Sequence, residues 1–192
     1  MNYKYKMFYE IRAKTHVRVS PSLLNTPTKE AVFQQLTSSF EGFISQDIGF
    51  AIAVTEVLNV GEGIIIPGDG AAFYETEFKM LTFLPEMQEI LLGKISDITN
   101  FGAFMNLGAV EGMIHVSQTM DDFISFSKQK TLTGKDSKKV LKVADKCRAR
   151  IIAVSYKDVA NPKIGLTMRQ PHLGNLKWLE EAPKKEKKGK KE

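Results

Sequence analysis

Hydrophobic and polar residues alternate with the two-residue period of a β-strand in two stretches of the first half of the chain, and an apolar run lies between them. Residues 5–19 place Met7, Tyr9 and Ile11 on one face and mainly charged side chains on the other. Residues 71–84 alternate in the same way, and residues 47–58 form an apolar run rich in Ile, Val and Ala. We therefore expect three strands, the middle one buried.

A helical period replaces this alternation over residues 26–40. Thr26-Pro27 supplies an N-cap followed by proline at the first helical position. Four apolar residues then recur at helical spacing, namely Ala31, Val32, Leu36 and Phe40, and Gly42 follows as a stop. The pattern predicts an amphipathic helix packed on an antiparallel sheet, an α+β arrangement.

Two glycine-rich segments punctuate this half. Residues 61–63 and 67–70 match neither the P-loop nor the dinucleotide-binding spacing, so we interpret them as turns. Pro67-Gly68 suits the central positions of a type II turn, because proline fixes the first φ and glycine accepts a positive φ at the second. Pro85 marks the expected boundary between a first domain, residues 1–85, and a second, residues 86–170.

The second domain opens with antiparallel strands over residues 94–115, which include Asn100-Phe101-Gly102-Ala103-Phe104. A bulge at Gly102 would bring the rings of Phe101 and Phe104 to one face, with His115 on the neighbouring strand. Three flat rings together would form a platform for unpaired bases, each stack contributing roughly 1–3 kcal/mol. The alternative is that the two phenylalanines belong to the core and that His115 is an ordinary strand residue.

This run resembles the S1 RNA-binding domain, a five-stranded oligonucleotide-binding barrel (OB-fold). The resemblance implies an all-β barrel in which Phe101, Phe104 and His115 occupy RNA-contacting positions. Residues 147–156 and 163–168 alternate as strands four and five, with Asn161-Pro162 in the turn between them. Where many S1 domains have an aspartate and an arginine, this chain has Ser155 and Lys163, so we expect weak, salt-sensitive and sequence-tolerant binding.

An insertion of about residues 118–144 separates strands three and four. Residues 121–126 and 131–135 suggest a hairpin with a glycine turn at Gly134, for use by a partner subunit or by RNA. Residues 171–183 form a C-terminal extension in which Trp178 is expected to anchor the chain on the barrel. Residues 184–192 contain six lysines and two glutamates and are predicted to be disordered.

Positive charge is concentrated in the second half. The net charge is −2 over residues 1–85, +4 over residues 86–170 and +3 over residues 171–192. Residues 128–150 alone hold nine Lys or Arg and two Asp, which would attract phosphate or simply be solvated. We count Lys94, Arg150 and Lys163 with the three rings as candidate RNA contacts.

Over residues 1 to about 180 the chain resembles the larger stalk subunit of archaeal RNA polymerase, the E-prime subunit, whose counterpart is the seventh subunit of eukaryotic RNA polymerase II. Besides the S1 run, three ordered segments carry this resemblance: residues 17–21 (VRVSP), 61–71 (GEGIIIPGDGA) and 166–171 (LTMRQP). It implies a truncated RNP-like N-terminal domain that docks on the polymerase core. The turn Pro67, Gly68, Asp69 and Gly70 is the candidate docking loop.

The resemblance also implies a function. The chain would be a non-catalytic accessory subunit that pairs with a smaller helical stalk subunit and binds nascent single-stranded RNA, supporting open-complex formation and elongation. A freestanding S1 adaptor in translation or RNA decay is the alternative. We expect no catalytic residues, no metal and no cofactor, because the carboxylates, histidines and single Cys147 show no informative spacing.

The pattern of the chain also bears on its compartment. No apolar run reaches a membrane span, and Met1–Lys6 lacks the apolar core of a secretory signal. We expect a cytoplasmic protein.

Overall fold

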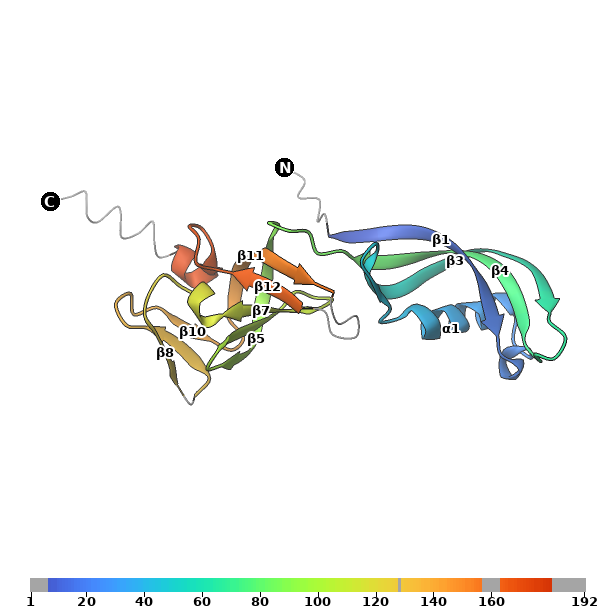
Figure 1. The fold of residues 1–192 in the computed structure, drawn as a ribbon, viewed down its shortest axis with the longest axis horizontal. Coiled ribbons are helices and arrows are strands. Elements are labelled where there is room, and N and C mark those ends of the chain that lie inside the picture. The colour runs from blue at the N-terminus through green and yellow to red at the C-terminus, as the bar shows by residue number, and fades with distance from the viewer. Residues whose placement is uncertain (1–6, 128, 157–162, 181–192) are drawn as a thin grey trace. The chain divides into compact units, whose positions relative to one another are not determined.

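A computed structural model describes residues 7–127, 129–156 and 163–180. The chain divides into two compact units, with the boundary between Leu84 and Pro85. Each unit is described by itself (Figure 1). In the part of the chain that the structure describes, no helix is long and apolar enough to cross a membrane.

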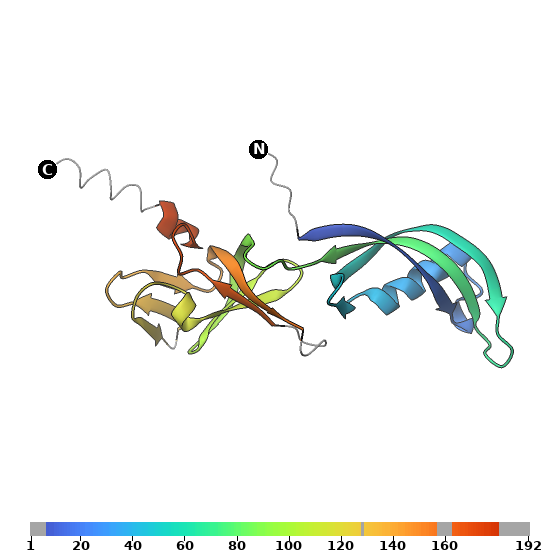
Figure 2. The ribbon, with the colours of Figure 1, turned by 45° about the horizontal axis from the view of Figure 1, so that its top comes forward.

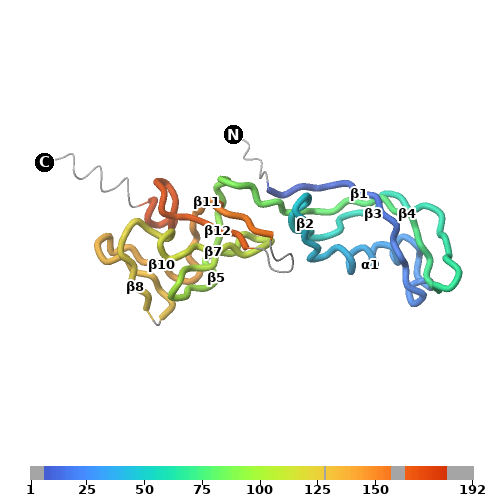
Figure 3. The backbone as a smooth tube through the Cα atoms, in the orientation of Figure 1, coloured from blue at the N-terminus to red at the C-terminus, as the bar shows by residue number. Residues whose placement is uncertain are grey.

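The first unit is a four-stranded antiparallel sheet with one helix. Its elements are β1 (Phe8–Val19), the short 3-10 helix η1 (Pro21–Leu23), α1 (Thr28–Phe40), β2 (Ile44–Ser45), β3 (Gly49–Ile65) and β4 (Ala72–Phe83). The strand order is β1-β4-β3-β2. Figure 2 shows α1 lying along one face of the twisted sheet. The short strand β2 pairs with the start of β3, and Figure 3 traces the backbone of both.

The core of this unit lies between α1 and the sheet. Ala31, Val32 and Leu36 of α1 are almost fully buried, as their helical spacing predicts. They pack with buried residues of the three long strands, among them Val17, Val54, Val57, Phe78 and Met80. The opposite sheet face carries ion pairs across β1 and β4, including Arg12 with Glu77 at 2.7 Å. This division confirms the two faces expected from the alternation.

Local chemistry fixes the ends of these elements. Helix α1 begins at Thr28 with Pro27 at the N-cap position, one residue later than predicted. The amide of Asp69 donates to the carbonyl of Ile66 at 3.0 Å and Gly68 has φ +92°, which confirms the turn centred on Pro67-Gly68. Strand β3 is longer than the expected run of residues 47–58, because bulges keep it paired with β4 as far as Ile65.

The second unit contains a closed five-stranded barrel. Its strands are β5 (Ile90–Thr99), β6 (Gly102–Asn106), β7 (Glu111–His115), β11 (Lys146–Ser155) and β12 (Lys163–Thr167). Ring closure follows the order β5-β6-β7-β12-β11, because β12 pairs with both β7 and β11, and β11 pairs with β5. Ile95, Met105, Ile114, Ile151 and Leu166 fill the interior. The predicted fold class, α+β followed by an all-β barrel, is confirmed.

The insertion forms a small sheet of its own. After the 3-10 helix η2 (Val116–Gln118) come β8 (Ile124–Ser127), β9 (Thr131–Gly134) and β10 (Val140–Lys142), in the order β10-β9-β8. The hairpin of β8 and β9 turns before Thr131, so the glycine turn expected at Gly134 is wrong for that hairpin. Gly134 ends β9 instead, where an added Cβ would collide with the Asp122 carboxylate. Leu132 and Leu141 are fully buried beneath this sheet.

The described part of the extension returns to the barrel. Strand β13 (Gly174–Asn175) pairs with β11, and residues 176–180 are helical. Lys139 Nζ of the insertion lies 5.6 Å from the centroid of the Trp178 ring. The Asn161-Pro162 turn and the Lys-rich tail lie outside the described residues.

Candidate nucleic-acid interface

A tight turn between β5 and β6 presents Phe101. The hydroxyl of Thr99 donates to the carbonyl of Gly102 at 3.1 Å, and the amide of Val116 donates to the carbonyl of Phe101 at 2.8 Å. These bonds fix the backbone on both sides of Phe101, while its side chain remains 46% exposed. The ring is therefore held in place and still reachable from solvent.

Phe104 lies on the outer face of β6, next to this turn. Its ring centroid is 6.1 Å from that of Phe101, with the planes at 90°. This edge-to-face geometry is a favourable arrangement for two aromatic rings. The half-buried Phe104 and the exposed Phe101 thus form one aromatic cluster on the barrel surface, and neither ring is sealed inside it.

Gly102 allows the backbones of β6 and β7 to approach each other closely beside the two rings. Gly102 pairs with His115 in a regular β6–β7 register, so the bulge expected at Gly102 is wrong. The register shift lies in β5 instead, between Ile95 and Asp97. A Cβ on Gly102 would collide with the carbonyl oxygen of Ile114, so the residue is required where the two backbones meet.

His115 ends β7 opposite Gly102 and is exposed. Its Nδ1 lies 2.8 Å from the hydroxyl of Ser117 and accepts from the backbone N–H of Ser117 at 3.3 Å. These contacts orient the ring and leave Nε2 directed away from them. The structure therefore brings together the three rings that the sequence singled out, Phe101, Phe104 and His115.

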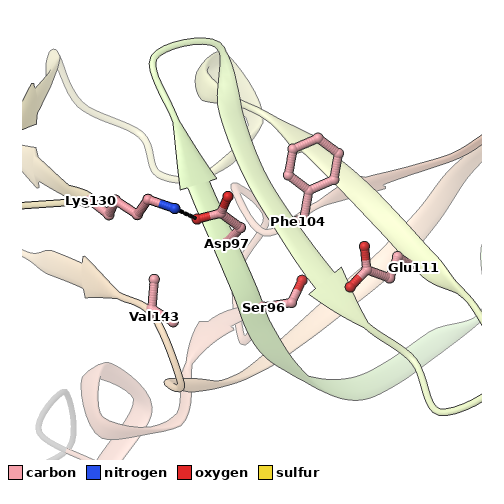
Figure 4. A pocket seen from close by; sticks show the side chains of 6 residues that line it. All are labelled: Ser96, Asp97, Phe104, Glu111, Lys130 and Val143. Carbon is pink, nitrogen blue, oxygen red and sulfur yellow. Dashed lines mark hydrogen bonds and ion pairs between the residues drawn. The ribbon is translucent and has the colours of Figure 1, made fainter.

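A cavity of about 570 Å³ adjoins the Phe104 ring. It is lined by Ser96, Asp97, Phe104, Glu111, Lys130 and Val143 (Figure 4). Lys130 Nζ donates to Asp97 Oδ1 at 2.7 Å, and the amide of Ile98 donates to the same oxygen at 2.8 Å. The Lys130 hydrogen bond, followed by that of Ile98, lowers the pKa of the Asp97 carboxyl. Sequence reasoning missed this cavity, because Lys130 reaches it from the insertion, 33 residues beyond Asp97.

The three predicted basic contacts are distributed around the barrel. Lys94 is exposed on β5 and pairs in register with Asn106 of β6, on the strand that carries Phe104. Lys163 begins β12 and is exposed, just before the pair Ile164–Gly112 that joins β12 to β7.

Arg150 lies apart from the rings. It is on β11, which β5 separates from β6, and it pairs with Ile90 and Thr167. Its Nε is buried and has no hydrogen-bond partner among the described residues. An RNA contact by Arg150 stays a prediction, as it does for the other five residues.

A second exposed feature lies at the β3–β4 turn of the first unit. Arg18 donates to both carboxylate oxygens of Asp69, at 2.9 and 2.7 Å, and these bonds lower the pKa of Asp69. Three consecutive isoleucines stand exposed directly before the turn, Ile64 at 61%, Ile65 at 70% and Ile66 at 48%. These isoleucines were not predicted as functional residues from the sequence, although three successive apolar residues at a turn are an unusual signal.

The described residues contain no group of three or more His, Cys, Asp or Glu that could hold a metal ion. Cys147 is fully buried in β11, and burial raises the pKa of its thiol to about 12, so it is a poor nucleophile.

Comparison with known proteins covers both units. Residues 14–70 match the family model "SHS2 domain found in N terminus of Rpb7p/Rpc25p/MJ0397", and residues 84–160 match "S1 RNA binding domain". The DNA-directed RNA polymerase subunit Rpo7 of Saccharolobus shibatae is 37% identical over 180 residues, which cover 93% of this chain and 100% of the relative. The chain belongs to the Rpo7 family of DNA-directed RNA polymerase subunits.

Two other relatives show how far this family likeness extends. Rpo7 of Sulfolobus acidocaldarius is 37% identical over 90% of this chain and 95% of its own length. The RNA polymerase III subunit rpc8 of Schizosaccharomyces pombe is 35% identical over 50% of this chain and 47% of its own. Membership confirms the resemblance to the polymerase stalk subunit and makes the chain an accessory part of a nucleotidyltransferase, with an S1 domain as its second unit.

Proposed function

We propose that this chain is a non-catalytic stalk subunit that binds nascent single-stranded RNA on its S1 barrel while its first unit docks on the polymerase core. Family membership supports the place in the polymerase. The RNA surface comprises Phe101, Phe104 and His115, flanked by Lys94 and Lys163. Arg150 would act from the opposite side of β5, as a contact for phosphate.

The observation that carries the RNA role is the exposure of fixed aromatic rings. Phe101 is 46% exposed, yet its backbone is hydrogen-bonded on both sides and its ring contacts Phe104 edge to face. A ring that is already ordered loses little entropy when a base stacks on it, so more of the stacking energy appears as affinity. The exposed lysines contribute attraction for phosphate, which depends on salt.

For core docking we propose the turn Pro67, Gly68, Asp69 and Gly70 together with the exposed residues Ile64–Ile66. The two-pronged Arg18–Asp69 pair supports a defined loop conformation. Burial of three isoleucine side chains on a partner would contribute a substantial hydrophobic free energy, because each now exposes about half or more of its surface.

Family membership supports a wider proposal about partners, role and compartment. The chain pairs with a smaller helical stalk subunit, supports open-complex formation and elongation, works in the cytoplasm, and contributes no catalytic residue, metal or cofactor. The domain limits expected from the sequence, 1–85, 86–170 and 171–183 with a Lys-rich tail of residues 184–192, belong to this proposal. A freestanding S1 adaptor is disfavoured, since both units match polymerase subunits over 93% of the chain.

Co-purification from the native cell tests this proposal. A tagged chain should recover the large polymerase subunits and a small helical protein. A variant with Ile65→Asp should lose the polymerase and still fold, because Ile65 is 70% exposed. Exposed Phe43 (45%) provides the control, since Phe43→Asp introduces the same charge in the same unit. Phe43 directly precedes β2, which pairs with the start of β3, whereas Ile65 is the last residue of that strand. Recovery of ribosomes or RNA-decay enzymes in place of polymerase would overturn the assignment.

A further inference from the structure

The cavity beside Phe104 contains one carboxylate that is already occupied and one that is available. Asp97 accepts hydrogen bonds from Lys130 and from the amide of Ile98. Glu111 stands exposed at the start of β7, and its carboxylate has no hydrogen bond or ion pair among the described residues. Lys130 balances the charge of Asp97, so the cavity presents one unbalanced negative group, Glu111, next to a stacking ring.

The position of Glu111 relative to the ring decides what it can contact. In Figure 4 the carboxylate of Glu111 and the hydroxyl of Ser96 both lie on one side of Phe104, on the strands that flank β6. A base that stacks on Phe104 would direct one edge toward these two groups. A phosphate would be repelled there, since like charges in contact are unfavourable. The cavity thus suits a base edge and excludes the backbone.

Hydrogen-bond chemistry narrows the choice of base. An ionised carboxylate only accepts hydrogen bonds, and it takes two parallel N–H donors especially well. The guanine pairing edge has two neighbouring donors, N1–H and the N2 amino group, followed by the O6 acceptor. Adenine, cytosine and uracil each place an acceptor beside their donor on that edge. A serine hydroxyl can donate to O6.

We propose that Glu111, Ser96 and Phe104 form a subsite that selects guanine in single-stranded RNA. This inference rests on the proposed RNA role of the barrel and changes one expectation from the sequence. Attraction of phosphate by Lys94 and Lys163 still does not depend on the RNA sequence, but the base at one nucleotide position is selected by the subsite. Lys130 is a positioning residue, because it keeps the Asp97 carboxylate engaged and leaves Glu111 as the free acceptor.

Fluorescence anisotropy with the full chain and labelled uridine 10-mers tests the subsite. The central nucleotide is guanosine, inosine, adenosine or uridine. A two-pronged contact in a solvent-open site should favour guanosine over adenosine or uridine by about 5- to 10-fold. Inosine lacks the N2 amino group, so it should lose most of this advantage.

Glu111→Gln replaces one acceptor oxygen with a donor group at nearly constant shape. It should abolish the guanosine preference, so that the guanosine strand binds no more tightly than the all-uridine strand. Glu62→Gln is the charge-matched control, because exposed Glu62 lies on β3 in the other unit, and it should retain the preference. Thermal unfolding of both variants checks that the barrel is intact.

The outcomes separate the two proposals. If the native chain binds every strand equally, or if Glu111→Gln keeps the preference, the subsite is overturned while the RNA role stands. If the native chain binds none of the strands, the proposed RNA role fails, and the subsite fails with it.

Discussion

Replacing Phe101 with alanine should weaken RNA binding and leave the chain folded. The side chain is 46% exposed and contacts Phe104 in an edge-to-face arrangement. Its removal leaves no closed cavity in the barrel, unlike truncation of a fully buried residue such as Met105, which would cost about 2–5 kcal/mol. We expect the unfolding free energy to fall by about 1–2 kcal/mol, because about half of the Phe101 surface is buried and one edge-to-face ring contact is lost.

The expected loss of affinity follows from the surface that a base can cover. One base stacked on an aromatic ring contributes roughly 1–3 kcal/mol. About half of the Phe101 surface is free for such a contact, so we expect the lower part of this range, about 1–1.5 kcal/mol. Since 1.4 kcal/mol corresponds to a factor of ten, the dissociation constant should rise about 5- to 12-fold.

Anisotropy titrations with a uridine 10-mer at two salt concentrations would measure this effect. Phe126→Ala is the matched control, because Phe126 is 42% exposed in the same unit but lies on β8 of the insertion. It should leave affinity unchanged. Stacking is largely independent of salt, whereas phosphate contacts are not, so Phe101→Ala should preserve the salt slope. An unchanged affinity for Phe101→Ala, or an equal loss in Phe126→Ala, would refute the stacking argument.

Three other outcomes are expected. Hydrogen bonds from Ser137, in the turn after β9, lower the pKa of Asp122 to about 2. The ionised carboxylate therefore contributes its full stabilisation above about pH 4, and this contribution is lost as the pH falls toward 2. In thermal unfolding at stepwise lower pH, Asp122→Asn should lose less stability on acidification than the native chain. Gly102→Ala should lower the unfolding free energy by about 2 kcal/mol or more, because the added methyl group would collide with the backbone at Ile114. Gly70→Ala should change the unfolding free energy little in the same denaturant titration, because the nearest atom to the added methyl group is Pro21 Cγ at an ordinary 3.7 Å. Asp69→Asn breaks the exposed pair with Arg18 and should reduce polymerase recovery on co-purification without a comparable change in the unfolding midpoint.

The architecture could be predicted because the strand period and the helix period of the sequence both arise when one face of an element is buried. The alternation in β1 and β4 and the spacing of Ala31, Val32 and Leu36 correspond directly to the observed core. The ends of the strands were harder to predict from the sequence. Strand β3 continues to Ile65 because bulges shift its register against β4. Such shifts depend on the partner strand, so they cannot be predicted from the alternation within β3 alone.

The ring cluster was found for a partly wrong reason. The motif from Phe101 to Phe104 indicated that both rings share a face, but Phe101 achieves this from the turn, while the bulge lies in β5. The cavity and the sheet of the insertion were out of reach, because Lys130 and Asp97 meet only in three dimensions. Ser96 and Glu111 lie on separate strands, and nothing in the sequence indicates that they line one cavity in the folded barrel.

The sealed position of Cys147 gives the protein a built-in reporter. It is the only cysteine in the sequence, it is fully buried in β11, and its raised pKa leaves almost no thiolate near neutral pH. Alkylation of this thiol therefore requires the strands around it to separate, and its rate measures how often they do so. A cysteine introduced at an exposed site such as Phe126 would react alone, which allows a dye to be attached to the native chain without first removing any residue.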